Sequence, residues 1–388
     1  MTAPPMITAP AAPLTYLDWN ATAPLSPVAR AAVIAALEVT GNPSSVHGAG
    51  RAARRLVEDA REQVAALAGV APSGIVFTAS GTEANGLALH QAPAGRPVAV
   101  SAIEHDSLLA PLGALPAARR VHLPVTATGR LDVTAAAELI ARHRPGLVSL
   151  MLANNETGVI QPVAEVAALA RAVGALVHCD AVQAPGRMAC DLLALGVHMM
   201  SLSAHKLGGP KGAAALVLAD GLEIRPLLAG GGQERRRRAG TEAVPALAGF
   251  GAAAAQALAG WRPAAGHMTA LRDRLEAAAL AAVPAATVWG RDVPRLPNTT
   301  ALALPGVAAE TQVIALDLAG IAVSAGSACS SGKVAASPVL AAMGAGRLAG
   351  QTVRISLGPT TSEAAVDHFL AAWIRLAADA AGPAVQVA

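Results

Sequence analysis

The stretch Ser201-Leu-Ser-Ala-His-Lys-Leu-Gly-Gly-Pro-Lys-Gly212 decides the fold that we expect for this chain. One apolar run, residues 197–202, leads into it, and a second, residues 213–218, follows its glycine-rich turn. A strand, a polar turn and another strand would place Lys206 at a strand end, in a crevice. With Ser203 and His205 beside it as donors to a phosphate, Lys206 could form a Schiff base with an aldehyde cofactor such as pyridoxal phosphate (PLP). The alternative is a surface turn, which an isolated Ser-x-His-Lys favours.

The composition points to a large soluble protein. The chain has 388 residues, enough for two domains, and 53% of them are hydrophobic. Much of that share is alanine, and no run reaches the roughly 18 unbroken apolar residues of a membrane-spanning helix. Lysine plus arginine (29) nearly balance aspartate plus glutamate (26), which does not indicate a nucleic-acid binder. The arginine run 235–238 has no aromatic residues between its charges and is more typical of a solvated or interface loop.

Cysteine usage indicates a reducing compartment, and we expect the cytoplasm. The three cysteines, Cys179, Cys190 and Cys329, form no CxxC motif and no even disulfide framework. The ten histidines show no HExxH spacing, so we predict no structural metal. The Pro- and Ala-rich residues 1–13 lack the basic start and apolar core of a signal peptide.

Strand and helix patterns alternate along the first part of the chain. Short apolar runs predict strands at residues 75–78, 97–101, 120–123, 146–152, 175–179, 197–202 and 213–218. Helical spacing lies between several of them, for example at 133–142 and 163–173. This alternation predicts an α/β fold with a mostly parallel sheet flanked by helices, which binds its ligand at the carboxyl ends of the strands.

The pattern loosens after residue 230 and predicts a second, smaller α+β domain. We expect a large domain over 14–250 and a small one over 251–388, with the first residues able to pack on the small domain. The small domain would hold two Ala-rich helices, from about 245 and over 269–282. Its other elements are listed in chain order: a strand at 299–304, a helix at 310–318, strands at 321–324 and 352–357, and a last helix opened by a Thr360–Glu363 capping box.

Two groups of residues could hold a phosphate and a ring. Ser80-Gly81-Thr82 lies between a strand and a helix, where backbone N–H groups bind anions, although many such turns are glycine-rich for steric reasons. Asp180 ends an apolar strand and could keep a pyridine nitrogen protonated, with Gln183 one turn later donating to the ring oxygen. The alternative for Asp180 is a helix N-cap.

Four further residues could act on a substrate. His105 follows a strand and could stack on a planar cofactor and relay protons, or simply cap a helix. Asn155 belongs to the polar run after strand 146–152, which suits ligand binding or a turn. Cys329 sits in a loop of small residues that favours an exposed nucleophile. Arg354, inside an apolar strand, would pair with an internal carboxylate or bind the carboxylate of a substrate.

Together and in this order, these stretches resemble the NifS/IscS-type cysteine desulfurases, in the class V aminotransferase group of PLP-dependent enzymes. The similarity covers residues 16–361. Its main motifs are Gly41-Asn-Pro-Ser-Ser45, Thr82-Glu83, Glu104-His105, Asn154-Asn-Glu-Thr-Gly158, Asp180-Ala-Val-Gln183, Ser203-Ala-His-Lys206, Gly230-Gly-Gly-Gln-Glu-Arg235, Gly240-Thr-Glu242, Gly326-Ser-Ala-Cys-Ser-Ser-Gly332 and Arg354-Ile-Ser-Leu-Gly358. The chain departs from the family at several positions, among them Arg236, where glycine is usual.

The resemblance implies the fold type I of PLP-dependent transferases and a role for each site residue. Lys206 would hold the cofactor and take the Cα proton of the substrate, and Cys329 would attack the substrate sulfur. The remaining roles are listed by ligand group: Gly81, Thr82, Ser203 and His205 at the phosphate, with Thr241 from the partner subunit of a homodimer; Asp180 at the ring nitrogen; Gln183 at the ring oxygen; His105 on the ring face; Asn155 at the cofactor and, with Arg354, at the substrate carboxylate.

The implied activity converts L-cysteine to L-alanine and leaves a persulfide on Cys329. The sulfur would pass to a protein acceptor, such as an iron–sulfur scaffold or a thiolation partner, and a transient contact of a cluster iron with Cys329 is left open. The competing hypotheses are another class V enzyme, either a selenocysteine lyase or an aminotransferase, which needs Lys206 but not Cys329, and a catalytically silent sulfur-trafficking scaffold.

Overall fold

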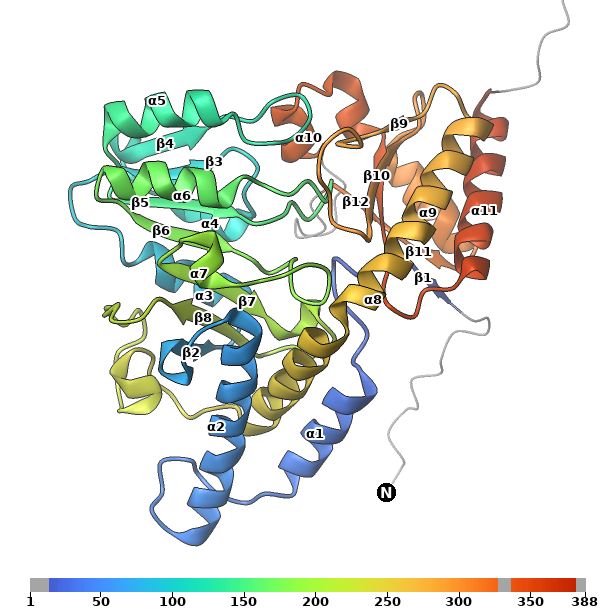
Figure 1. Ribbon diagram of the computed structural model, residues 1–388. Coiled ribbons are helices and arrows are strands. Elements are labelled where there is room, and N and C mark those ends of the chain that lie inside the picture. The colour runs from blue at the N-terminus through green and yellow to red at the C-terminus, as the bar shows by residue number, and fades with distance from the viewer. Residues whose placement is uncertain (1–13, 327–335, 382–388) are drawn as a thin grey trace, which may run out of the picture.

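A seven-stranded sheet forms the centre of the larger part of the molecule (Figure 1), in a computed structural model that describes residues 14–326 and 336–381. Its strands, in chain order, are β2 (Ile75–Thr78), β3 (Val98–Ser101), β4 (Arg120–Leu123), β5 (Leu147–Met151), β6 (Leu176–Asp180), β7 (Met199–Ser203) and β8 (Ala214–Leu218). Their bounds differ from the expected ones by at most one or two residues.

The sheet has the order β2-β8-β7-β6-β5-β3-β4, and the five strands from β7 to β4 run parallel. Only β8 runs antiparallel to its neighbours β7 and β2. Most of these strands are buried along their whole length, because helices cover both faces of the sheet. The predicted mostly parallel sheet is therefore confirmed.

Helices lie on the two faces in separate layers. The first layer holds α2 (Gly48–Ala68), α5 (Val133–His143), α6 (Val163–Ala172) and α7 (Leu192–Leu195), whose apolar residues form one core with the sheet. The second holds α3 (Gly81–Leu89) and α4 (Asp106–Gly113), which pack on the opposite face. Figure 1 shows α5, α6 and α7 in front of the sheet and α3 and α4 behind it.

One long helix, α8 (Val244–Ala282), joins the two parts of the molecule (Figure 1). The sequence predicted two helices here, and that prediction was wrong, because the helix continues through Pro263. Alanine-rich sequence has a high helix propensity, and apolar contacts on both sides of the proline hold the helix together. Phe250 packs in the core of the parallel sheet, whereas Leu271 and Leu275 pack in the second core.

The second core is built on a four-stranded antiparallel sheet with the order β12-β13-β10-β9. Its strands are β9 (Thr287–Val288), β10 (Thr299–Ala303), β12 (Ser324–Ala325) and β13 (Thr352–Ser356), and the helices of this part are α9 (Ala309–Leu318), α10 (Pro338–Ala342) and α11 (Glu363–Ala381). The start of the described chain, β1 (Thr15–Tyr16), pairs with β11 (Ile321–Ala322), and Leu17 is fully buried in this core. The N-terminal segment thus packs on the second part, as the sequence analysis allowed.

Two local predictions in this part differ from the structure. The expected strand 321–324 is divided into β11 and β12, which belong to different sheets. The last helix is capped by Ser362, whose hydroxyl accepts the Ala365 N–H at 3.2 Å, and not by Thr360. The reason is that the chain still turns at Thr361, whose hydroxyl accepts the Gly358 N–H at 2.9 Å.

Among the described helices, α8 is the one that is long and apolar enough to cross a membrane by length and composition. Many of its apolar residues are buried, because it packs against α1 (Pro27–Leu37) and α2 and contributes to both cores. We therefore read α8 as an internal helix.

Residues 234–236 form a turn with left-handed backbone. The φ angles of Glu234, Arg235 and Arg236 are +46°, +56° and +64°, and none of the three is a glycine. Glu234 is held there by a buried ion pair with Arg61, at 2.7 Å. Arg236 is exposed and occupies the position where the resembling family usually has glycine. An L-residue in this conformation costs roughly 1–2 kcal/mol.

We therefore expect Arg236→Gly to raise the free energy of unfolding by about 1 kcal/mol, because glycine removes the left-handed strain. Urea unfolding followed by circular dichroism measures it. Arg55→Gly, at an exposed arginine inside α2, is the matched control and should lower stability by about 1 kcal/mol. Equal losses for both variants would contradict the assignment of strain to Arg236.

Candidate active site

A cavity of about 300 Å³ lies at the carboxyl ends of the parallel strands. Its wall combines the ends of β5, β6 and β7, the start of α3, the N-terminal segment and one residue of β13. It brings together ten of the residues that the sequence singled out, namely Gly81, Thr82, His105, Asn155, Asp180, Gln183, Ser203, His205, Lys206 and Arg354. Such edges of α/β sheets are the usual place for ligand binding.

Two of the sequence-derived residues are not in this wall. Thr241 is exposed and lies in the segment before α8, away from the cavity. Cys329 lies outside the described residues. The described chain resumes close to the cavity after it, where Pro338 and Val339 contribute to the wall.

Lys206 ends a short 3₁₀ turn, Ala204–Lys206, that directly follows β7. Its Nζ donates to the carbonyl oxygens of Asn20 at 2.6 Å and Ala21 at 2.9 Å. The ammonium thus lies inside the crevice between the sheet edge and the N-terminal segment, and the surface-turn alternative does not apply.

Asp180 is the last residue of β6 and is 7% exposed. Its Oδ2 accepts from Asn85 Nδ2 at 2.7 Å, and its Oδ1 accepts from the Val182 backbone N–H at 3.1 Å. Donors on both oxygens suit the carboxylate form, which can hold a basic ring nitrogen protonated. No helix begins here, so Asp180 is not an N-cap.

The opposite end of the cavity has the features of an anion site. The N-terminus of α3 begins at Gly81, where an added Cβ would come within 3.3 Å of Val182 Cγ2 and 3.5 Å of Ser203 Cβ. The Ser203 hydroxyl is buried and has no hydrogen-bond partner within the described ranges. A helix N-terminus and an unsatisfied buried hydroxyl together fit a phosphate group.

His205 faces the same region as a neutral imidazole. Its Nδ1 lies 3.2 Å from Thr22 Oγ1. Burial lowers the pKa of His205 to about 4, and the charges of Lys206 and Lys211 add to the effect. At neutral pH, the ring would therefore donate to a ligand without contributing a charge.

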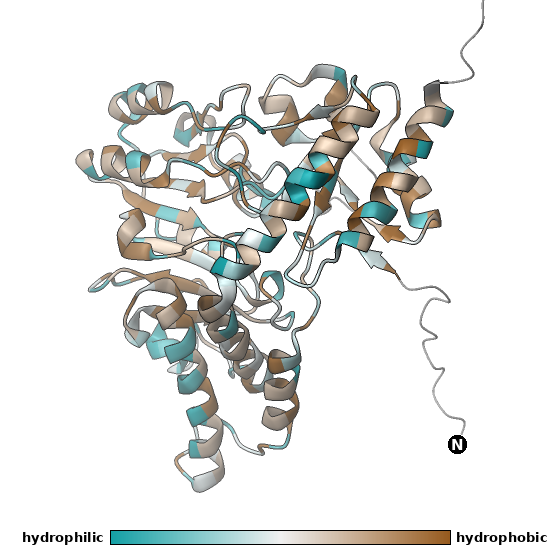
Figure 2. Ribbon diagram, turned by 45° about the vertical axis from the view of Figure 1, so that its right-hand side comes forward, coloured by the Kyte–Doolittle hydropathy of each residue, from teal (hydrophilic) through white to brown (hydrophobic). Residues whose placement is uncertain are grey.

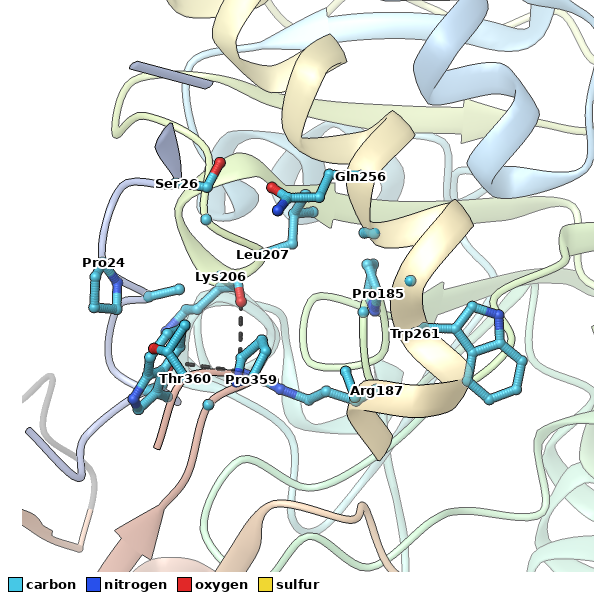
Figure 3. Close-up of a pocket in the computed structure, with 18 of the residues that line it drawn as sticks. Pro24, Ser26, Pro185, Arg187, Lys206, Leu207, Gln256, Trp261, Pro359 and Thr360 are labelled. Carbon is cyan, nitrogen blue, oxygen red and sulfur yellow. Dashed lines mark hydrogen bonds between the residues drawn. The ribbon is translucent and has the colours of Figure 1, made fainter. Parts of the chain in front are cut away.

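Arg187 is a site residue that sequence reasoning missed. It is 6% exposed and donates to the Gln183 carbonyl at 2.8 Å and to the Gln183 side-chain Oε1. Its other end donates at 3.4 Å to the carbonyls of Trp19 and Lys206. Figure 3 shows Arg187 and Lys206 beside a second, largely apolar cavity. Because Oε1 of Gln183 is occupied in this way, the amide NH₂ is the end left for a ligand, and it also donates to Asn20.

Arg354 pairs with an internal carboxylate, which is one of the two roles that the sequence left open. Its Nη2 donates to Asp18 Oδ1 at 2.7 Å, and its Nη1 donates to the Asn155 carbonyl at 3.2 Å. The arginine also lines the cavity, and its buried Nε has no partner in the part of the chain that the structure describes. Asp18 in turn accepts from Ser324 on β12, shortly before the segment that carries Cys329.

Glu104 is a second residue that sequence reasoning did not single out for a role. Its Oε1 accepts from Ser101 Oγ at 2.5 Å and from the Met151 N–H at 2.8 Å, while its buried Oε2 has no partner among the described residues. Burial raises the pKa of Glu104 from 4.5 to about 8, opposed by its two hydrogen bonds and reinforced by the nearby Asp180. Glu104 is therefore protonated at neutral pH.

Comparison with known proteins gives one family. The protein-family model described as aminotransferase class-V matches residues 15–369. A cysteine desulfurase of Cereibacter sphaeroides is 45% identical, over 92% of this chain and 93% of the relative. The cysteine desulfurase NifS of Azotobacter vinelandii is 41% identical, over 92% and 90%. A solved NifS-like protein of Rickettsia africae is 35% identical, with a TM-score of 0.88 over 95% of this chain and 100% of that one.

The chain therefore belongs to the class V aminotransferase family, whose members are PLP-dependent enzymes. The architecture agrees with this class, since the structural neighbour aligns over both parts of the molecule. Within the family it is a NifS/IscS-type cysteine desulfurase, as the sequence resemblance predicted.

The raised pKa of Glu104 predicts a dependence of stability on pH. Between pH 4.5 and 8 the folded protein keeps a proton that the unfolded chain has released, so this group makes stability fall as pH rises through that window. Glu104→Gln cannot titrate. We expect the free energy of unfolding of the variant, relative to that of the wild type, to increase by on the order of 1 kcal/mol per pH unit between pH 6 and 8.

Urea unfolding of both proteins at pH 6 and pH 8 measures this gain. Glu165→Gln, at an exposed position on α6, serves as the control. Its difference in unfolding free energy from the wild type should be the same at pH 6 and pH 8. A Glu104→Gln offset that is the same at both pH values would rule out a buried protonated Glu104.

Proposed function

We propose that this enzyme holds PLP in the cavity at the strand ends and uses Cys329 to remove the sulfur of L-cysteine. The observation that carries the proposal is the presence of Lys206 Nζ, the Asp180 carboxylate and the unsatisfied Ser203 hydroxyl in one cavity. These groups match the aldehyde, the ring nitrogen and the phosphate of PLP. Bound PLP withdraws electrons from the substrate Cα and weakens the bond between Cβ and sulfur.

The side chains of the cavity would bind the substrate and move its protons. Arg354 and Asn155 orient the carboxylate, which fixes the Cα–H bond relative to Lys206. Lys206 Nζ takes the Cα proton as general base, and the two carbonyls that now accept from it keep it within the crevice. His105 covers the ring face and carries a proton to or from the substrate.

The sulfur transfer itself would be the work of Cys329. Its thiolate attacks the sulfur of bound cysteine, a sulfur–sulfur bond forms and the bond from Cβ to sulfur breaks. Cβ takes up a proton, so that L-cysteine and the enzyme thiol give L-alanine and an enzyme persulfide. The persulfide then passes its outer sulfur to a protein acceptor, such as an iron–sulfur scaffold or a thiolation partner. The cytoplasm suits such a carrier, because thiols remain reduced there.

In the presence of a reductant, the wild-type enzyme should release alanine and sulfide from L-cysteine in equal amounts. Cys329→Ala should retain the absorbance of bound cofactor and lose sulfide release. Lys206→Ala should lose turnover by about 10²–10⁴-fold, because the general base is missing. Both products are quantified in the same reaction.

Cys190→Ala is the thiol-matched control, since Cys190 is buried and burial raises its pKa to about 12. It should release sulfide at the wild-type rate. Full activity of Cys329→Ala would instead favour a selenocysteine lyase or an aminotransferase that depends on Lys206. If the wild type and the variants bind PLP and none of them is active, a silent scaffold is favoured.

A homodimer would complete the site, as Thr241 and the outer face of α1 suggest. Thr241, which the family resemblance assigns to the partner's phosphate, is exposed on this chain. On α1, Ile34 and Leu37 are 51% and 65% exposed, and the helix carries Arg30 as its one charge. Figure 2 shows α1 mostly brown and pale beside the teal residues of α2. An apolar face of this kind is typical of a covered surface.

We expect Ile34→Asp combined with Leu37→Asp to convert the dimer to a monomer, because two charges would be buried at the interface. Light scattering after size-exclusion chromatography gives the mass. Leu318→Asp, at an 84% exposed leucine of α9, is the control and should leave the dimer intact. If the double variant in α1 remains a dimer, the interface lies elsewhere.

A further inference from the structure

Two buried polar side chains, Asn85 and Ser107, lie between Asp180 and His105. Asn85 is on α3 and is 1% exposed, and Ser107 is in the first turn of α4 and is 7% exposed. None of the roles described above involves them. They line the same cavity, and together with Asp180 and His105 they form a continuous hydrogen-bond chain across its floor.

The direction of each bond in this chain follows from the chemistry of its ends. The Asp180 carboxylate also accepts from the Val182 N–H, so the 2.7 Å contact with Asn85 is donated by the amide NH₂. The same nitrogen lies 2.8 Å from Ser107 Oγ and gives its second hydrogen to that hydroxyl. The Ser107 hydroxyl therefore directs its own hydrogen to His105 Nδ1, at 2.8 Å.

A second donor fixes the state of the same imidazole nitrogen. His105 Nδ1 also accepts the backbone N–H of Ser107 at 3.1 Å, as the N-cap of α4. A backbone N–H cannot reverse its direction, so Nδ1 must present a lone pair. A neutral His105 then carries its proton on Nε2.

We infer that Asn85 and Ser107 are positioning residues that hold His105 in the Nε2-protonated tautomer and tie its ring to the Asp180 carboxylate. The use of this tautomer in the reaction rests on the proposed function. In that reaction, Asp180 would lie at the ring nitrogen of the cofactor and His105 on its ring face. The hydrogen-bond chain would keep these two side chains in a fixed geometry relative to each other. Any proton that His105 exchanges with the substrate would pass through Nε2.

The tautomer can be measured directly by ¹⁵N NMR of enzyme labelled at histidine, with and without PLP, using His105→Gln to identify the resonances. We expect an unprotonated Nδ1 and a protonated Nε2 in the wild type, since Nδ1 has two donors. Ser107→Ala removes one donor and leaves the helix cap, and should lower the ratio of the two tautomers about five-fold, the loss expected for one hydrogen bond. Ser107→Thr keeps the hydroxyl and should restore the wild-type ratio.

Thr15→Ala is the matched control, because Thr15 Oγ1 makes a similar 2.9 Å contact with Nδ1 of a different histidine, His368, away from the cavity. It should alter the His368 resonances and leave those of His105 unchanged. A wild-type His105 with its proton on Nδ1, or an unchanged ratio in Ser107→Ala, would overturn the inference. Because this readout needs neither cofactor nor turnover, it distinguishes a failure of the inference from a failure of the proposed function.

The reaction gives a second readout in the PLP-bound enzyme. With L-cysteine, Ser107→Ala should lower kcat about ten-fold and leave KM unchanged, since it affects proton transfer and not substrate binding. Ser107→Thr should recover kcat. An altered tautomer with unchanged kcat would overturn the link between this hydrogen-bond chain and the reaction.

Discussion

A ladder of three buried polar side chains crosses the parallel sheet and fixes the register on which the site depends. His178 on β6 contacts Ser149 on β5 through Nδ1 and Ser201 on β7 through Nε2, both at 2.8 Å, and all three residues are fully buried. Burial lowers the pKa of His178 to about 4, so the ring is neutral and offers one donor and one acceptor. A slip of one residue would break both contacts and turn Asp180 to the other face. The ladder thereby holds Asp180 and the turn of Lys206 at one edge.

The N-terminal segment closes the site from the other side. The Asn20 carbonyl accepts from both Lys206 and Gln183, while its side chain donates to Thr299 and to the Asn155 carbonyl. The preceding Asp18 pairs with Arg354. A single extended segment therefore connects the parallel sheet, the second sheet and the cavity between them. Together with α8, these polar contacts hold the two parts relative to each other, and with them Lys206 and Arg354 on the two sides of the cavity.

The sequence was sufficient where the signal is local. Apolar runs with a polar residue after them predicted the strands and placed Asp180 and His105 near strand ends. It was insufficient where the partner is distant. Arg187 and Glu104 each contact one residue close in sequence, Gln183 and Ser101. Their other partners come from β5, the N-terminal segment and the turn of Lys206, so the sequence near them does not indicate burial beside the site. The continuous helix through Pro263 was missed for the same reason, since contacts with two separate cores outweigh the local effect of the proline.

The charges of the cavity follow from what it must bind. In the proposed function, PLP brings a phosphate and the substrate brings a carboxylate, so further negative charge in the wall would oppose both. Burial raises the pKa of Glu104 to about 8 and also raises that of Glu156, whose Oε2 accepts from Ser337. With Glu104 neutral, no second anion lies beside Asp180 where we propose that the ring nitrogen binds. In the proposed function, the Arg354 guanidinium meets the carboxylate of the substrate, while Lys206 meets the aldehyde of PLP. The burial that raises the pKa values of Glu104 and Glu156 thus favours the binding of anionic ligands in this cavity.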